Sequence, residues 1–106
     1  MVAEATRTDV EQLKKVSLGE ISNLKEYVAL LNSIIENLDQ DIIVTRAKAK
    51  EFMRTGQKEN YGHLMERIHE TILRIETCRK CVDECNADLA RKEERVREYN
   101  QFLGIK

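Results

Sequence analysis

The sequence predicts an all-α fold, an antiparallel coiled-coil helical hairpin of two long helices, and three observations predict it. Charged residues make up 35% of the 106-residue chain, aromatic residues only 5%, and proline is absent. Two long stretches carry apolar residues at alternating steps of three and four, and one glycine-containing turn signal separates them. Such a composition is typical of long helices with a narrow apolar seam. We therefore expect residues 1–7 to be a flexible N-terminus and residues 8–106 to form a single hairpin domain.

The first helix is expected over about residues 8–54. Thr8 with Glu11, and Ser17 with Glu20, have the spacing of a capping box, in which a hydroxyl and a carboxylate satisfy free amides at a helix start. Gly19 within a helix costs about 1 kcal/mol relative to alanine. Either one helix runs through Gly19, or a short N-terminal helix ends and a new one begins. We favour a break at residues 17–19.

The seam of this helix follows the a and d positions of a coiled coil over five heptads. Only Thr45 and Ala49 are weak members. The members are Ile21, Leu24, Val28, Leu31, Ile35, Leu38, Ile42, Thr45, Ala49 and Phe52.

A turn is expected over residues 55–60. Gly56 suits the left-handed conformation that ends many helices, and Arg54 complements the negative C-terminal dipole. The second helix is expected over about residues 61–103, with Lys92 as the polar member of its seam. That seam contains Tyr61, Leu64, Ile68, Thr71, Ile75, Cys78, Val82, Cys85, Leu89, Lys92, Val96, Tyr99 and Leu103.

Two helices of similar length joined by a short turn favour an antiparallel hairpin. The alternative is one continuous helix in a parallel dimer, with Gly56 tolerated inside it. In the hairpin, Thr45 falls near Ile68 and Lys92 near Ile21, so the two polar seam residues do not meet each other. We expect them to help fix alignment, and another chain to meet them.

A second set of apolar residues lies outside the seam of the first helix. Because these positions face away from the second helix, they predict an association surface. The partner-binding strip contains Tyr27, Ala29, Leu30, Ile34, Ile43 and Val44. Three arrangements would cover it: a second hairpin in a four-helix bundle, helices of a different protein, or the residues before Ser17 folded back. Scattered surface apolar residues are the alternative to any such surface.

The tip of the hairpin is basic, although the net charge of the chain is only −1. Five bases and one acid fall within residues 46–58. The bases are Arg46, Lys48, Lys50, Arg54 and Lys58. Complementation of the helix dipole explains part of this pattern, and a docking point for an acidic protein partner is the functional interpretation.

Other chemistry has little support in the sequence. Cys78, Cys81 and Cys85 share one helical face, but two are seam residues, so core packing is favoured over a thiol switch or a zinc site. No phosphate loop, nucleophile elbow or metalloprotease motif occurs, and no apolar run would span a bilayer. We expect no catalytic residue, metal, cofactor, small-molecule substrate, nucleic acid or membrane insertion. An odd number of cysteines, which fits a reducing compartment better than a disulfide framework, and the absence of a signal pattern favour an intracellular, cytoplasmic protein.

The size, the hairpin plan and the triplet Glu59-Asn60-Tyr61 resemble the tubulin-binding cofactor A chaperones. The stretch before the triplet is longer here, and the proline-containing segment of that family is absent. The plan is equally similar to small coiled-coil subunits of vesicle-tethering, ciliary transport and kinetochore assemblies. No functional residue carries over from either comparison. The sequence therefore predicts a non-enzymatic protein-binding module, an adaptor or scaffold subunit that forms a homodimer or hetero-assembly, with a chaperone for a client such as tubulin as the alternative.

Overall fold

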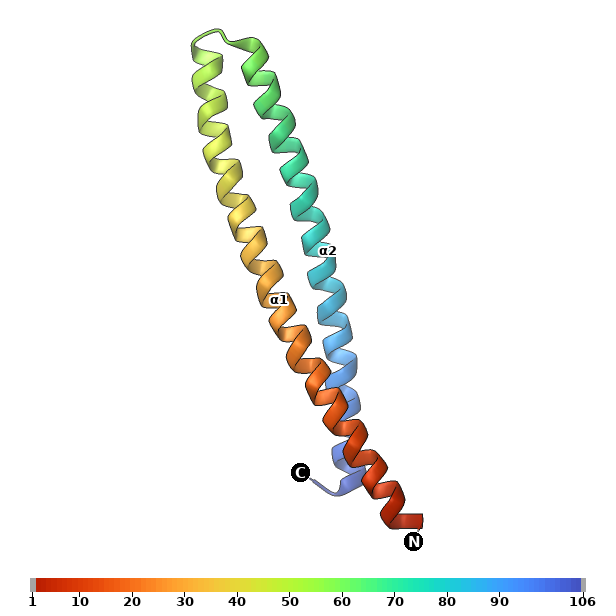
Figure 1. Cartoon of the computed structure of the whole chain (residues 1–106). Coiled ribbons are helices and arrows are strands. Elements are labelled where there is room, and N and C mark those ends of the chain that lie inside the picture. The colour runs from red at the N-terminus through yellow and green to blue at the C-terminus, as the bar shows by residue number, and fades with distance from the viewer. Residues whose placement is uncertain (1, 106) are drawn as a thin grey trace. The chain divides into compact units, whose positions relative to one another are not determined.

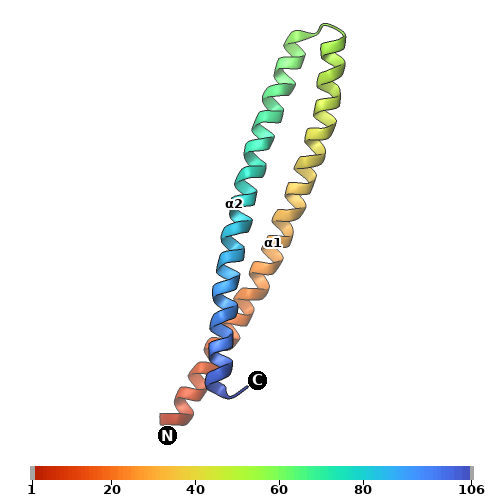
Figure 2. The same ribbon diagram turned by 180° about the vertical axis from the view of Figure 1, so that it is seen from behind.

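Two helices contain nearly all of the residues that the structure describes. The computed structural model describes residues 2–105, with side chains from residue 6 onward. Helix α1 spans Val2–Arg54 and helix α2 spans Lys58–Leu103, and no strand occurs within residues 2–105. Figures 1 and 2 show the two helices side by side below the turn, with antiparallel chain directions. The predicted all-α helical hairpin is confirmed.

The chain divides into two compact units. One unit is the continuous segment Leu30–Val82, which contains the turn. The other combines the part of α1 up to Ala29 with the part of α2 from Asp83 onward. Each unit is therefore a pair of helical segments, one from α1 and one from α2.

The seam within Leu30–Val82 forms a hydrophobic core. Its centre is the buried cluster of Ile42, Ile68 and Ile75, against which three partly buried apolar residues pack. These three are Ile35, Leu38 and Ile72. Every predicted seam residue of this unit is buried or half-buried, and the weak members Ala49 (3% exposed) and Thr45 (4%) are among the most buried.

Helix α1 differs from the prediction at two places. It begins at Val2, before the predicted start near Thr8, because nothing in the preceding sequence disfavours a helix, and Arg7 forms an i,i+4 ion pair with Glu11 at 3.5 Å. It also runs through residues 17–19 without the expected break. Ser17, predicted to cap a new helix, is instead buried in the seam together with Ile21. Burial on both sides of Gly19 offsets the cost of a helical glycine.

The turn has the hydrogen bonds of a Schellman motif. Gly56 has a φ of 75°, its N–H donates to the Met53 carbonyl at 3.2 Å, and the N–H of Gln57 donates to the Phe52 carbonyl at 2.8 Å. The predicted role of Gly56 is thus confirmed. Helix α2 starts at Lys58, earlier than the predicted Tyr61, because the Gln57 carbonyl already accepts a helical hydrogen bond from the Tyr61 N–H.

The polar seam residues Thr45 and Lys92 are each packed within their own unit of the chain. In the unit that contains Lys92 and Glu20, the Lys92 ammonium lies 2.5 Å from a carboxylate oxygen of Glu20, and Lys25 pairs with Glu93 at 3.9 Å. The Lys92 side chain is only 18% exposed. Thr45 is buried within its own unit. Within the chain, Lys92 therefore has an ion-pair partner and Thr45 is buried, and contact of these two residues with another chain stays a prediction.

Candidate protein-interaction surfaces

The members of the predicted partner-binding strip are all exposed. Tyr27 is 47% exposed, Leu30 56%, Ile34 38%, Ile43 59% and Val44 52%. Ala29 is exposed as well. The residues before Ser17 continue α1 and do not fold back, so that arrangement for covering the strip is absent from the structure. The apolar side chains outside the seam therefore remain open to solvent.

These residues do not form one surface. Ile34 and Ile43 are nine residues apart, and at about 100° per residue they point to opposite sides of α1. They also line two different grooves between α1 and α2, both inside the unit Leu30–Val82. The predicted strip thus divides into two faces, one on each side of the seam.

The first face is the Ile34 face, which we define as Leu30, Ile34 and Val44 of α1 with Leu73 of α2. Ile34 and Leu73 line a groove of about 400 Å³. The groove is completed by Leu38, Arg74, Thr77 and Cys78. An ion pair between Asp41 and Arg67, 3.2 Å from Oδ1 to Nη2, joins α1 to α2 in this unit.

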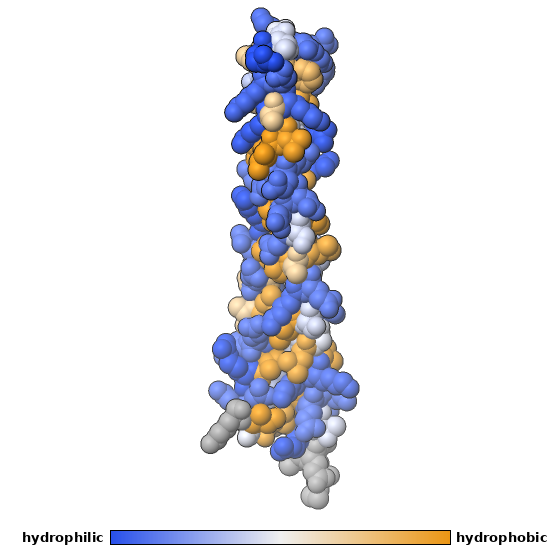
Figure 3. Space-filling model, turned by 90° about the vertical axis from the view of Figure 1, so that its left-hand side faces the viewer, coloured by the Kyte–Doolittle hydropathy of each residue, from blue (hydrophilic) through white to orange (hydrophobic). Residues whose placement is uncertain are grey.

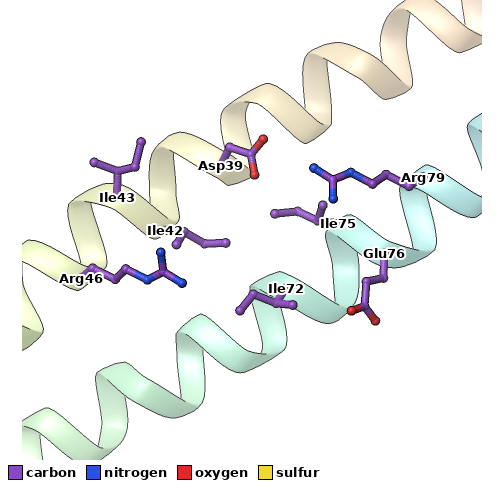
Figure 4. A pocket seen from close by; sticks show the side chains of 8 residues that line it. All are labelled: Asp39, Ile42, Ile43, Arg46, Ile72, Ile75, Glu76 and Arg79. Carbon is purple, nitrogen blue, oxygen red and sulfur yellow. The ribbon is translucent and has the colours of Figure 1, made fainter.

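The second face is the Ile43 face, which we define as the α1 residues Glu36, Asp39, Ile43, Arg46 and Lys50. All five are exposed. Asp39, Ile43 and Arg46 border a groove of about 350 Å³ together with Ile42 and the α2 residues Ile72, Ile75, Glu76 and Arg79. In Figure 4, Ile42 and Ile75 point between the helices and Ile43 points away from α2. This groove has an isoleucine floor and a charged rim.

The sequence reasoning missed Leu73. The predicted strip lay wholly on the first helix, yet Leu73 of α2 is 48% exposed and lines the first groove together with Ile34. The available signal was a large aliphatic residue two positions from a seam residue. Figure 3 shows apolar groups at the surface in patches that hydrophilic side chains separate. Exposed Met53 (58%) and Met65 (40%) add to the apolar surface of this unit.

The predicted basic tip is also divided. Arg46 and Lys50 are four residues apart on the Ile43 face, while Lys48 lies two residues from each and points to the other side of α1. The Arg54 guanidinium donates two hydrogen bonds to the Glu51 carboxylate, at 2.5 and 3.2 Å, and these bonds raise the pKa of Arg54 above its ordinary value. All five bases are exposed, but they do not converge on one point.

The three cysteines are free and half-buried. Cys78 lies under the Ile34 face, where it lines the groove. Within residues 2–105, no group of three or more histidine, cysteine, aspartate or glutamate side chains is placed to hold a metal ion. No helix in the same part of the chain is both long and apolar enough to span a membrane.

Comparison with known proteins does not assign this chain to a family. No protein-family model, no curated protein and no solved structure matches this chain.

Proposed function

We propose that this chain is a non-enzymatic protein-interaction module, a small coiled-coil adaptor or scaffold subunit of a larger intracellular assembly. Its partner binds the Ile34 face by helix packing. The observation that carries the proposal is the exposure of Leu30, Ile34, Val44 and Leu73 outside a seam that the chain already fills itself. Free cysteines support an intracellular setting, where thiols stay reduced.

The energetics of burial support this assignment. Covering one large aliphatic side chain contributes roughly 1.5–3 kcal/mol. Leu30 and Ile34 are four residues apart on one helix, and Leu73 lies across a groove from Ile34. An apolar helix from a partner that lies along this groove would contact side chains of both α1 and α2. In such helix-in-groove complexes, apolar side chains spaced three or four residues apart on the bound helix pack into the groove. Binding of this kind requires no catalytic residue.

The experiment compares capture of partners by the wild-type chain and by the Leu30→Lys, Ile34→Lys double variant. Two charges in the groove region would be buried without partners in the complex, so the variant is expected to lose the captured protein. The wild-type complex must also re-form from its purified components in a fixed ratio. Gln12→Lys with Ser22→Lys is the matched control, because it adds the same charge at exposed positions of α1 outside the unit Leu30–Val82.

Loss of the partner from the face variant, with retention by the control, supports the proposal. Equal capture by both variants would contradict it. A chaperone for a folding intermediate would give a different result, since its client exchanges and leaves no complex of fixed ratio.

A further inference from the structure

We infer that the Ile43 face binds a second copy of this chain, with the two α1 helices antiparallel and Ile43 of one copy packed on Ile43 of the other. This surface differs from the face that carries the proposed function, so either assignment can fail without the other. The chain would then be a homodimer that keeps its Ile34 faces free for another protein.

The first observation is that the charges of this face are unused within the chain. Two other pairs of charges that flank the seam join the two helices, Asp41 with Arg67 and Lys25 with Glu93. Glu36, Asp39, Arg46 and Lys50 form no ion pair or side-chain hydrogen bond with any described residue.

The groove beside this face shows the same feature. In Figure 4, Asp39 and Arg79 extend toward each other above the isoleucine floor, but they do not form an ion pair. Arg46 reaches toward α2 near Ile72, also without a charged partner. The face therefore presents both signs of charge around Ile43, whose side chain is 59% exposed.

The second observation is the order of these charges along α1. The two acids precede Ile43 and the two bases follow it, at steps of three and four that keep all five residues on one stripe of the helix. Glu36 and Lys50 each lie seven residues from Ile43, and Asp39 and Arg46 lie four and three residues from it. The stripe is acidic on one side of an apolar centre and basic on the other.

Such a stripe is complementary to itself in one orientation only. In an antiparallel pair centred on Ile43, Glu36 of one copy faces Lys50 of the other, and Asp39 faces Arg46. A two-fold axis makes each of these contacts twice, as in every isologous interface. A parallel pair would place like charges opposite each other and would be disfavoured. The charges thus select both the partner and its direction.

The test uses two charge-reversal variants and sedimentation equilibrium. Glu36→Lys with Asp39→Arg makes the stripe wholly basic, and Arg46→Glu with Lys50→Glu makes it wholly acidic. The wild type is expected at twice the mass of 12.4 kDa. Each variant alone is expected to associate more weakly, on the order of 10- to 100-fold, because attractive pairs become repulsive. An equal mixture of the two variants is expected to recover the dimer.

The control is Glu66→Lys with Glu70→Lys, which reverses two exposed acids of α2 away from the Ile43 face. It changes the net charge as much as the basic variant does and is expected to leave the dimer intact. Helix content by circular dichroism verifies that every variant folds. A wild type that sediments as one chain overturns the inference. So does a larger assembly that the reversals leave unchanged, or a mixture of variants that stays monomeric.

Discussion

At the scale of single residues, the pair of Lys92 and Glu20 shows how a charged side chain is accommodated in an apolar seam. Lys92 occupies a seam position and is only 18% exposed, and its ammonium reaches Glu20 on the other helix at 2.5 Å and Asp88 on its own helix at 3.9 Å. A long aliphatic stem lets lysine cover apolar surface while its charge stays near solvent. The pair therefore joins α1 to α2 within the chain, and its role in fixing their alignment stays a prediction.

We predict that Glu20→Gln lowers the free energy of unfolding by roughly 0.5–1 kcal/mol, since Lys92 then loses its partner from the other helix. Urea denaturation at low and high salt measures the change, and salt should shrink it. Glu26→Gln is the matched control, an exposed glutamate of the same helix that forms no ion pair with a described residue. If both variants unfold at the same urea concentration as the wild type, the pair does not stabilise the fold.

At the scale of the helices, glycine has opposite roles in α1 and in the turn. Gly19 lies inside α1, and a Cβ built there meets no atom within 4 Å. Gly56 is equally open but has a φ of 75°, which strains any residue with a side chain. Two glycines with the same space around them therefore differ only in the backbone conformation they must adopt.

The same substitution at these two positions is expected to change stability in opposite directions. Gly19→Ala should raise the free energy of unfolding by about 1 kcal/mol, because alanine is the better helix former. Gly56→Ala should lower it by roughly 1–2 kcal/mol, because of the left-handed conformation. Thermal and urea unfolding measure both. A stabilising Gly56→Ala would show that the turn does not hold a left-handed residue.

The sequence predicted the seams and the end of each helix well, and it failed where packing competes with a local signal. Alternation of three and four placed every seam residue, and Gly56 marked the turn. At Ser17, the capping pattern predicted a break, but burial of the serine in the seam outweighs that local preference. Ile34 and Ile43 were assigned to one strip because both lie outside the seam. Their spacing of nine residues already places them on opposite sides of a helix, and the position of α2 shows which groove each one lines.

At the scale of the whole molecule, the hairpin fills its own seam and leaves α1 apolar on both flanks. Helix α2 is polar over most of its exposed surface, so the two helices are not equivalent as binding elements. One flank of α1 carries a balanced set of charges around Ile43, and the other carries Leu30, Ile34 and Val44 with a single ion pair nearby. This asymmetry underlies our assignment of a second copy to one flank and a different protein to the other.

The most direct test of this account is photo-crosslinking from single positions of α1. A photoreactive phenylalanine analogue replaces Ile34, Ile43 or Gln12 in separate copies of the 106-residue chain. Each variant is illuminated in cell extract, and its covalent products are identified by mass spectrometry. Position 43 should give a covalent dimer of the chain, position 34 should give an adduct with a different protein, and the exposed position 12, outside the unit Leu30–Val82, should give neither. The same products from all three positions, or none from positions 34 and 43, would contradict the claim that the two flanks of α1 are binding faces.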